Sequence, residues 1–318
     1  MKYVTRRLLY LIPTLLLVSM IIFFLMRILP GDVATLMLVG PEGTGTPTHE
    51  QIAKLNAQMG LNRPLVVQYL DWMGNLLRGR AGTSFWTNRP VMQELLSRLP
   101  LTLELGLLTT VIGTALAIPL GVLAAVNRGN WIDYFSRVFA IGGLAIPSFW
   151  AGILIILALE KIFGWTAPLG YSSLFKNPRA NLSQMILPAL ALGYAHAALV
   201  SRLVRSSLLE VMREDYIRTA RSKGLKGFII IVRHALRNSM LPVITVIGLG
   251  LAAIFGGTVI METVFSLPGV GRFMVDAINH RDFPVVQTLT FLFAIVYMLV
   301  NLAVDVTYGI LDPRLRVA

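Results

Sequence analysis

The sequence predicts an all-α polytopic membrane protein with six transmembrane helices and both termini in the cytoplasm. Of its 318 residues, 55% are hydrophobic and 14% are charged, whereas a soluble domain carries about 25% charged residues. This composition excludes an ordinary soluble enzyme and a disordered protein. The net charge of +12 does not indicate nucleic-acid binding, because the basic residues lie between apolar runs. The absence of cysteine excludes a disulfide framework and a thiolate metal site.

Six apolar stretches are long enough to cross a bilayer, which requires about 20 residues in a helix. Helices are the expected form, because lipid offers no hydrogen-bond partner to open backbone groups. The six predicted spans are Leu8–Met26, Leu99–Val126, Val138–Leu159, Leu182–Ser201, Ser239–Met261 and Phe283–Val304.

The distribution of Lys and Arg predicts which side of the membrane each loop occupies. With both termini inside, the inner segments hold 16 basic and 6 acidic residues, and the outer segments hold 12 and 10. This agrees with the excess of Lys and Arg that cytoplasmic loops carry. The opposite topology would export the most basic loop, Arg202 to Arg237.

The first apolar stretch resembles a signal peptide in having Lys2, Arg6 and Arg7 before it. Its apolar core is longer than a signal core, and no small-residue cleavage site follows, so we interpret it as a retained anchor. The predicted organisation is an anchor helix, an extracytoplasmic loop with short helices, a core domain and a cytoplasmic tail. These occupy residues 1–29, 30–98, 99–310 and 311–318.

The outer loop contains two helical patterns. Thr48-His49-Glu50-Gln51 is a capping box, and Pro64 suits the start of a second helix that runs to Gly79. This loop is either a lid or docking platform, or packing around the outer helix ends.

The inner loop at about 205–238 is the most informative segment. Between Leu208 and Ala220, apolar residues recur at three- and four-residue steps with basic residues between them, which predicts an amphipathic helix. Gly224 then ends it. The pattern alone allows three interpretations: docking on a soluble partner, lying on anionic headgroups, or a connector that obeys the charge rule.

The chain lacks the motifs of a membrane enzyme. No G-x-x-x-x-G-K-[ST] stretch is present, so no phosphate-binding loop for ATP is expected in this chain. The four histidines share no metal-ligand spacing, and we predict no catalytic residue and no metal site. His196 is the one ionisable residue well inside a span, where packing or an interhelical hydrogen bond is a better interpretation than ligand binding.

Two segments are hypothetical parts of a transport pathway. Pro147 is expected to kink the third span, and Ser148, Phe149 and Trp150 follow it, although Phe149 and Trp150 also suit a lipid-facing position. The outer segment 265–282 fits a gate or a contact with an outer partner.

An ordered series of motifs extends along nearly the whole chain. The most specific is Glu214-Asp215-Tyr216-Ile217-Arg218-Thr219-Ala220-Arg221-Ser222-Lys223-Gly224-Leu225, followed by His234-Ala235-Leu236-Arg237-Asn238-Ser239-Met240-Leu241-Pro242. Others are Leu29-Pro30-Gly31-Asp32, Gly60-Leu61-Asn62-Arg63-Pro64-Leu65, Glu262-Thr263-Val264-Phe265-Ser266-Leu267-Pro268-Gly269, Arg281-Asp282-Phe283-Pro284 and Asp312-Pro313-Arg314-Leu315-Arg316. The series resembles the B-type permease of ABC importers for dipeptides, oligopeptides, glutathione or nickel. Arg80 departs from the pattern, because relatives tend to carry an acid there.

The resemblance implies the type I importer permease fold and a complex in a prokaryotic inner membrane. Its members would be a second homologous permease, two cytoplasmic ATPases that bind ATP and Mg, and an extracytoplasmic substrate-binding protein. The cargo would be small peptides, or alternatively glutathione or a nickel chelate.

The resemblance also assigns roles to individual residues. The residues that would couple this chain to the ATPase are Tyr216, Arg218, Thr219, Ala220, Lys223, Gly224 and Leu225. The candidate pathway residues are Ser148, Phe149, Trp150 and Glu262. The candidate gate or docking residues are Arg272, Asp276, Arg281 and Asp282.

Two functions of other classes compete with the importer hypothesis. A secondary carrier acting alone would be expected to have internal repeats and mid-span carboxylates, and neither is evident. The second competing function is that of a membrane-bound scaffold that transports nothing.

Overall fold

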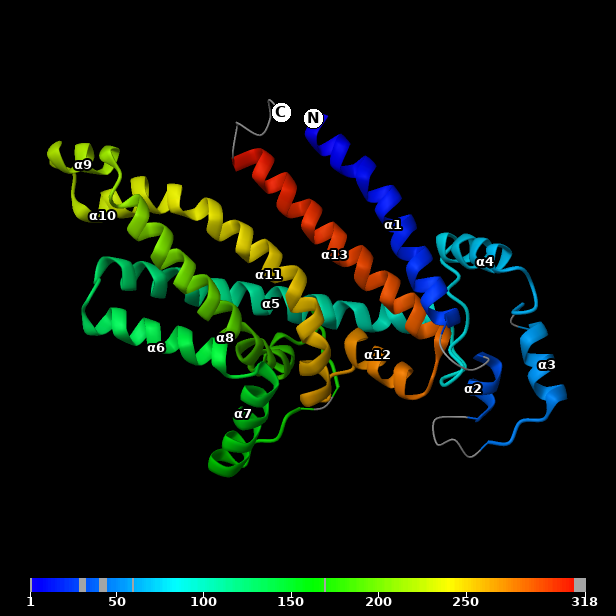
Figure 1. The fold of residues 1–318 in the computed structure, drawn as a ribbon. Coiled ribbons are helices and arrows are strands. Elements are labelled where there is room, and N and C mark those ends of the chain that lie inside the picture. The colour runs from blue at the N-terminus through cyan, green and yellow to red at the C-terminus, as the bar shows by residue number, and fades with distance from the viewer. Residues whose placement is uncertain (1, 29–32, 40–44, 59, 169, 312–318) are drawn as a thin grey trace. The chain divides into compact units, whose positions relative to one another are not determined.

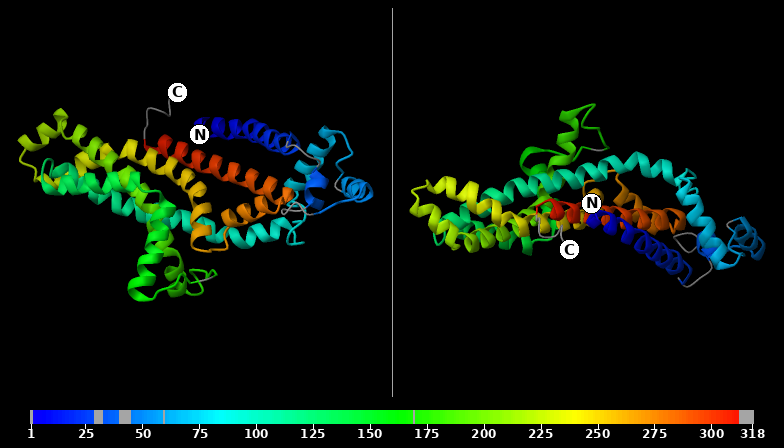
Figure 2. Two further views of the ribbon diagram at one scale, coloured as in Figure 1. Left: turned by 60° about the horizontal axis from the view of Figure 1, so that its bottom comes forward. Right: turned by 90° about the horizontal axis from the view of Figure 1, so that it is seen from above.

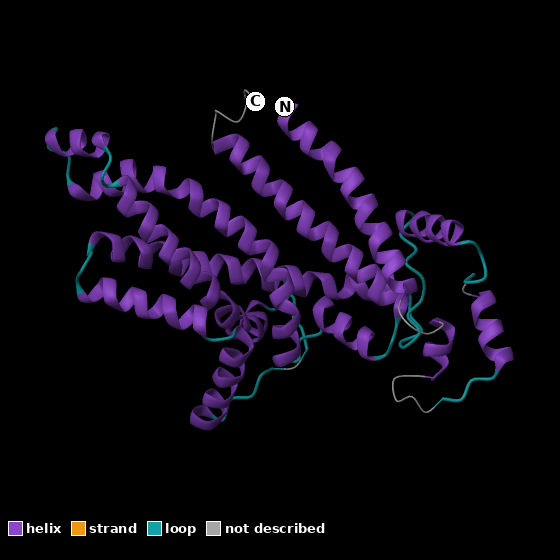
Figure 3. Ribbon diagram, viewed as in Figure 1, coloured by secondary structure: helices purple, strands orange, loops and turns teal. Residues whose placement is uncertain are grey.

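The computed structural model describes residues 2–28, 33–39, 45–58, 60–168 and 170–311. These residues are almost entirely helical, and no strand is drawn among them (Figure 3). The first helices are α1 (Lys2–Ile28), α2 (Val33–Val39), α3 (His49–Gln58), α4 (Leu65–Leu77), α5 (Val91–Val126), α6 (Trp131–Ala145) and α7 (Ser148–Phe163). The remaining helices are α8 (Pro178–Val211), α9 (Asp215–Ser222), α10 (Gly227–Ile229), the π-helical η1 (Ile230–Ala235), α11 (Leu236–Val264), α12 (Val270–Asn279) and α13 (Phe283–Leu311) (Figure 1).

The backbone contacts divide the chain into two compact units. Unit 1 comprises Met1–Thr102 and Pro268–Met298, and unit 2 comprises Leu103–Leu267 and Leu299–Ala318. Unit 1 therefore holds the short helices between α1 and α5, together with α12. Unit 2 holds α6 to α11.

Among the described residues, five helices are long and apolar enough to cross a membrane. They are α1, α5, α8, the helical stretch Gly227–Leu251 that includes the first part of α11, and α13. A sixth span exists if the bent pair of α6 and α7 counts as one. The prediction of a single span over Val138–Leu159 is therefore corrected, because the helix breaks in its middle and its two halves meet at 103°.

The break has a local cause at Pro147. Proline lacks an N–H and disfavours the helical conformation in the residue before it. Ile146 accordingly adopts φ −89° and ψ 118°, and Pro147 itself becomes the residue that precedes α7. In Figure 2 the green helix α7 projects away from the direction of α6 in both views. The expected kink at Pro147 is thus a break that separates two helices, whereas α5 continues through Pro119 without a break.

The centre of unit 2 is α8, which packs against α6, α7 and α11. Small residues allow this close approach. A Cβ added at Gly143 in α6 would lie 2.6 Å from the Cβ of Ala198, and one added at Gly121 in α5 would lie 2.6 Å from Val204. Helices in membranes associate through such small-residue contacts, because lipid supplies no hydrophobic driving force between them.

His196 fits this packing as a structural residue. It is buried, and its Nε2 lies 3.3 Å from Thr114 Oγ1 of α5. Its ring also fills the space beside Gly113 and Gly250, where an added Cβ would approach it to 2.9 and 2.8 Å. The interpretation of His196 as a packing and hydrogen-bonding residue is confirmed.

Unit 1 contains the two helices predicted in the outer loop. The capping box at the start of α3 is formed, with Thr48 N–H donating to Gln51 Oε1 at 2.9 Å and Gln51 N–H donating to Thr48 Oγ1 at 3.3 Å. Helix α4 starts after Pro64 as expected and ends two residues before Gly79, whose φ is +74°. The start of α5 packs on α12 and α13 through a buried cluster that includes Val91, Leu95, Phe273, Val285 and Leu289.

Candidate functional site

The α9 segment, residues 212–225, connects α8 to the stretch that leads into α11. The predicted amphipathic helix over Leu208–Ala220 is not one helix. Helix α8 continues to Val211, a turn covers residues 212–214, and α9 begins at Asp215. The apolar residues keep their helical spacing across this turn because both helices pack into the same core cluster, to which Leu208 and Ile217 belong. The sequence pattern therefore could not reveal the break between the two helices.

Two residues anchor α9 to the rest of unit 2. Ile217 is fully buried and Ala220 is nearly so. They belong to one core cluster with Ala125 of α5, Leu208 of α8 and Ala235 of η1. Full burial of an Ile side chain contributes about 1.5–3 kcal/mol. Unit 2 therefore holds α9 firmly through its apolar face.

The opposite face of α9 is polar, basic and exposed. Arg218, Thr219 and Lys223 are exposed, and Tyr216 is 40% exposed while its hydroxyl accepts a hydrogen bond from Asn238 Nδ2 at 2.8 Å. The ion pair between Arg218 and Asp215, at 3.5 Å, lies in solvent and contributes little to stability. The surface offered by this short helix is therefore available to a partner.

The end of α9 is fixed by a glycine. Gly224 N–H donates to Arg221 O at 2.9 Å, and Leu225 N–H donates to Ala220 O at 3.3 Å. These two bonds form a Schellman motif, in which the residue after the C-cap adopts the left-handed conformation. Gly224 has φ +77°, and a Cβ placed there would meet nothing within 4 Å. Its role is therefore conformational rather than steric.

The predicted pathway residues fall into two groups in unit 2. Ser148, Phe149 and Trp150 form the first turn of α7, directly after the break, and the two aromatic rings are 42% and 47% exposed. Glu262, near the end of α11, is fully buried. Helices α7 and α11 contact each other, but Glu262 does not present its carboxylate at a surface of the chain.

The predicted gate or docking residues lie on and after α12 in unit 1. Arg272 is partly buried and Asp276 is exposed. Arg281 has φ +54° and Asp282 N–H donates to Ala277 O at 2.8 Å, so α12 ends in the same motif as α9 without a glycine.

Asp282 is 1% exposed and acts inside unit 1. Its Oδ2 accepts hydrogen bonds from Ser84 Oγ at 2.5 Å and from the backbone N–H of Trp86 at 3.3 Å. Asp282 thereby fixes the loop between α4 and α5, and it offers no exposed carboxylate to a docking protein.

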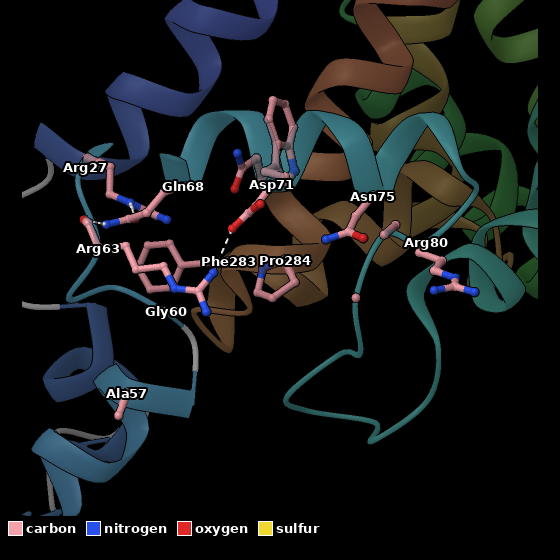
Figure 4. A pocket seen from close by; sticks show the side chains of 14 residues that line it. Arg27, Ala57, Gly60, Arg63, Gln68, Asp71, Asn75, Arg80, Phe283 and Pro284 are labelled. Atoms are coloured by element: carbon pink, nitrogen blue, oxygen red, sulfur yellow. Dashed lines mark hydrogen bonds and ion pairs between the residues drawn. The ribbon is translucent and has the colours of Figure 1, made fainter. Parts of the chain in front are cut away.

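Unit 1 also contains a cavity of about 340 Å³, which sequence reasoning did not find (Figure 4). Arg27 Nε donates to Gln68 Oε1 at 3.1 Å, and Arg63 pairs with Asp71 at 2.9 Å on its wall. Gln287 lines the cavity, and its amide nitrogen is buried without a hydrogen-bond partner in the described residues. Such a wall, rich in donors, suits a polar or anionic group.

A buried ionic cluster in unit 2 was also missed. The Asp133 side chain is 1% exposed and accepts hydrogen bonds from Arg205 Nε at 2.7 Å, from the second guanidinium nitrogen of Arg205 at 3.0 Å and from Arg137 at 3.0 Å. The backbone N–H of Gly129 supplies a fourth bond at 3.0 Å. The four-residue spacing of Asp133 and Arg137 could have indicated their ion pair from the sequence. Nothing in the sequence indicates the pairing of Asp133 with Arg205, which is 72 residues away.

A third polar contact joins α5 to the loop that precedes α8. Tyr171 Oη donates to Glu104 Oε2 at 2.7 Å. Burial, together with the neighbouring Glu104 carboxylate, raises the pKa of Tyr171 to about 12. Glu104 is therefore paired within unit 2.

No group of three His, Cys, Asp or Glu side chains suited to a metal ion exists in the part of the chain that the structure describes.

A multi-pass helical chain with an exposed basic helix between two spans has the form of a membrane component of a transport system. The chain belongs to the family of binding-protein-dependent transport system inner membrane components, whose pattern matches residues 117–317. The N-terminal pattern of the same kind of component matches residues 1–106. The chain is therefore an ABC transporter permease of the inner membrane.

Relatives match over nearly the whole chain. The probable peptide ABC transporter permease y4tP of Sinorhizobium fredii is 39% identical over 314 residues, covering 99% of both chains. The dipeptide transport system permease DppB of Escherichia coli is 39% identical, also with 99% of both chains covered. The glutathione transport system permease GsiC of Salmonella typhimurium is 38% identical over 316 residues with the same coverage.

Solved structures confirm the predicted fold. The MetNI methionine ABC transporter in an inward-facing conformation matches with a TM-score of 0.56 at 20% identity, covering 70% of this chain and 97% of the other. An amino acid ABC transporter with histidines matches with a TM-score of 0.52 at 15% identity, covering 70% and 94%. The all-α permease fold is thus confirmed, while the side of the membrane on which the termini lie stays a prediction.

Proposed function

We propose that this chain is the permease subunit of an ATP-driven importer of small peptides, and that α9 transmits the energy of a separate ATPase to the membrane helices. The observation that carries this proposal is the construction of α9. Its apolar face is packed into unit 2, its basic face is exposed, and its end is fixed by Gly224.

A coupling element must be both accessible and stiff. Accessibility lets a partner bind it, and stiffness lets a displacement at α9 reach the spans instead of being absorbed locally. Ile217 and Ala220 connect α9 to α5, α8 and η1 through one cluster, so movement of α9 displaces three elements together. A partner shifts such an equilibrium only through its different affinity for the two states of the permease.

The charge distribution supports placing α9 in the cytoplasm, where the ATPases reside. Residues 213–226 contain five basic and two acidic residues, as cytoplasmic loops of membrane proteins usually do. In this topology both termini are cytoplasmic. The chain has no phosphate-binding loop of its own, so ATP and Mg would bind to the partner ATPases.

The remaining partners follow from the family. A second homologous permease completes the pathway, and an extracytoplasmic binding protein delivers the peptide to unit 1 on the outer side. The exposed start of α7, at Ser148 to Trp150, is the proposed wall of the pathway. The proposed docking surface is reduced to Arg272, Asp276 and Arg281, because Asp282 is buried.

Peptide cargo is supported by the relatives named as peptide and dipeptide permeases, which are 39% identical to this chain. Glutathione is the second candidate, because GsiC is nearly as similar at 38%. Glutathione is itself a small peptide, so one pathway chemistry serves both cargoes.

Reconstitution tests the function. The chain, its paralogous permease and both ATPases are placed in liposomes, with the binding protein outside and ATP inside. We expect uptake of a labelled dipeptide that requires both ATP and the ATPases, and that unlabelled glutathione inhibits weakly. Uptake that proceeds without the ATPases contradicts the function, and inhibition by glutathione at lower concentrations than by dipeptides reassigns the cargo.

A further inference from the structure

Unit 2 contains a cavity of about 260 Å³ between α6 and α8 that has no part in the proposed function. These two helices contact each other and are joined by the ion pair between Asp133 of α6 and Arg205 of α8. One wall of the cavity is apolar and consists of Ala140, Ile141 and Leu144. The other carries arginine side chains of α8. The cavity is therefore amphipathic.

A buried hydroxyl in this cavity lacks a partner. Ser136 lines the cavity, is 5% exposed, and its Oγ makes no hydrogen bond within the described residues. Leaving a buried hydroxyl unsatisfied costs free energy, and native proteins usually avoid it. Ser136 is positioned to donate to an acceptor that enters the cavity.

The cavity carries an excess of positive charge. Arg137, Arg202 and Arg205 all line it, while Asp133 is the one carboxylate bonded to this group. Arg137 and Arg205 already donate to Asp133. Arg202 is exposed and makes no ion pair or hydrogen bond with another described residue. A guanidinium binds phosphate oxygens through charge-assisted hydrogen bonds, so the cavity suits an anion of this type.

The position along the helices indicates the source of the phosphate. Arg202 and Arg205 directly follow the apolar stretch of α8, and Ile141 and Leu144 of α6 are 67% and 47% exposed. A headgroup at the arginines would therefore place its acyl chain against exposed apolar side chains. Basic pockets between membrane helices bind anionic headgroups in this way.

We propose that the cavity between α6 and α8 binds one anionic phospholipid, with its phosphate at Arg202 and Ser136 and an acyl chain along Ile141 and Leu144. Inorganic phosphate shares the headgroup chemistry but gains nothing from the apolar wall. The site lies next to the anchor of α9, because Ala124 lines the cavity and Ala125 belongs to the cluster under Ile217.

Two substitutions test the positive charge of the cavity and its free volume separately. Arg202→Gln removes the unpaired cation and leaves the Asp133 cluster intact. Ala140→Leu fills the cavity without changing any charge. Arg179→Gln is the matched control, because Arg179 is an exposed arginine at the opposite end of the same helix.

The full-length chain is purified with the subunits that accompany it, delipidated, and titrated with phosphatidylglycerol under native mass spectrometry. We expect one tightly bound phosphatidylglycerol, an affinity about tenfold lower in Arg202→Gln and in Ala140→Leu, and wild-type affinity in Arg179→Gln. Phosphatidylethanolamine, which has no net charge, is expected to bind much more weakly.

Three outcomes overturn the proposal. The first is wild-type affinity in both cavity variants, and the second is equal affinity for the two lipids. The third is displacement of the lipid by inorganic phosphate at comparable concentrations, which would make this a free-phosphate site. Melting temperatures of both variants are measured alongside, and either variant alone suffices if the other fails to fold.

Discussion

Replacing Gly224 with valine isolates the conformational role of the turn that ends α9. The position has φ +77°, and an added Cβ meets nothing within 4 Å, so the Cβ itself creates no clash. The cost is confined to the backbone, because L-residues in the left-handed region lose about 1–2 kcal/mol. Valine, being β-branched, stands at the upper end of this range.

The expected consequence is a displaced α9 in an otherwise intact permease. A cost of about 2 kcal/mol changes the equilibrium between the native turn and alternatives by roughly 30-fold. Because Ile217 and Ala220 are buried in the core cluster of α9, unit 2 is expected to stay folded. Asparagine tolerates the left-handed conformation, so Gly224→Asn is the matched control.

The assay compares substrate-stimulated ATP hydrolysis and peptide uptake in reconstituted importers that carry each variant. We expect Gly224→Val to lower uptake at least several-fold and to weaken the stimulation, with membrane insertion and melting temperature close to wild type. Gly224→Asn is expected to retain most of both activities. Wild-type uptake in the valine variant, or an equal loss in the asparagine variant, would refute the conformational argument.

Three further predictions concern stability. Asp133→Asn removes the buried carboxylate that two arginines share and is expected to cost about 3–5 kcal/mol, measured as a lower melting temperature in detergent; an unchanged melting temperature would contradict a structural ion pair. Gly250→Ala places a Cβ 2.8 Å from a buried imidazole and is expected to cost about 1–3 kcal/mol, whereas Gly256→Ala on the same helix meets nothing within 4 Å and should be neutral or stabilising. Tyr171, whose pKa is raised from 10.0 to about 12, contributes stability that is fully present below pH 10 and is lost as the pH rises through 12. Tyr171→Phe should therefore lower the melting temperature at neutral pH and abolish the additional loss in this alkaline window, and an identical alkaline profile in both proteins would argue against it.

The fold was largely predictable because its signals are local. The apolar stretches predict the membrane helices, the capping box predicts the start of α3, and Gly224 predicts the end of α9. Each of these depends on residues that are close together in the sequence. The break between α6 and α7 was only partly predictable, because Pro147 indicates a bend but not its angle of 103°.

The parts that sequence reasoning missed depend on distant or unusual residues. The Asp133–Arg205 pair joins positions far apart in the chain, and both cavities are formed by several helices. Two helices end in the left-handed motif at Ser266 and Arg281, where no glycine marks the turn. Asp282 was predicted from its motif as an outer contact, but Ser84 binds its carboxylate in the interior.

A cross-link from α9 to an ATPase subunit tests most directly whether α9 is the contact with the ATPase. The chain has no cysteine, so Thr219→Cys supplies a unique thiol on the exposed face of α9, and Arg179→Cys supplies a control at an exposed position near the start of α8. We predict that a thiol-reactive linker on residue 219 captures the ATPase in membranes and that the same linker on residue 179 does not. Absence of the cross-link at residue 219 in an importer that hydrolyses ATP, or capture of an extracytoplasmic protein there, would contradict the central claim.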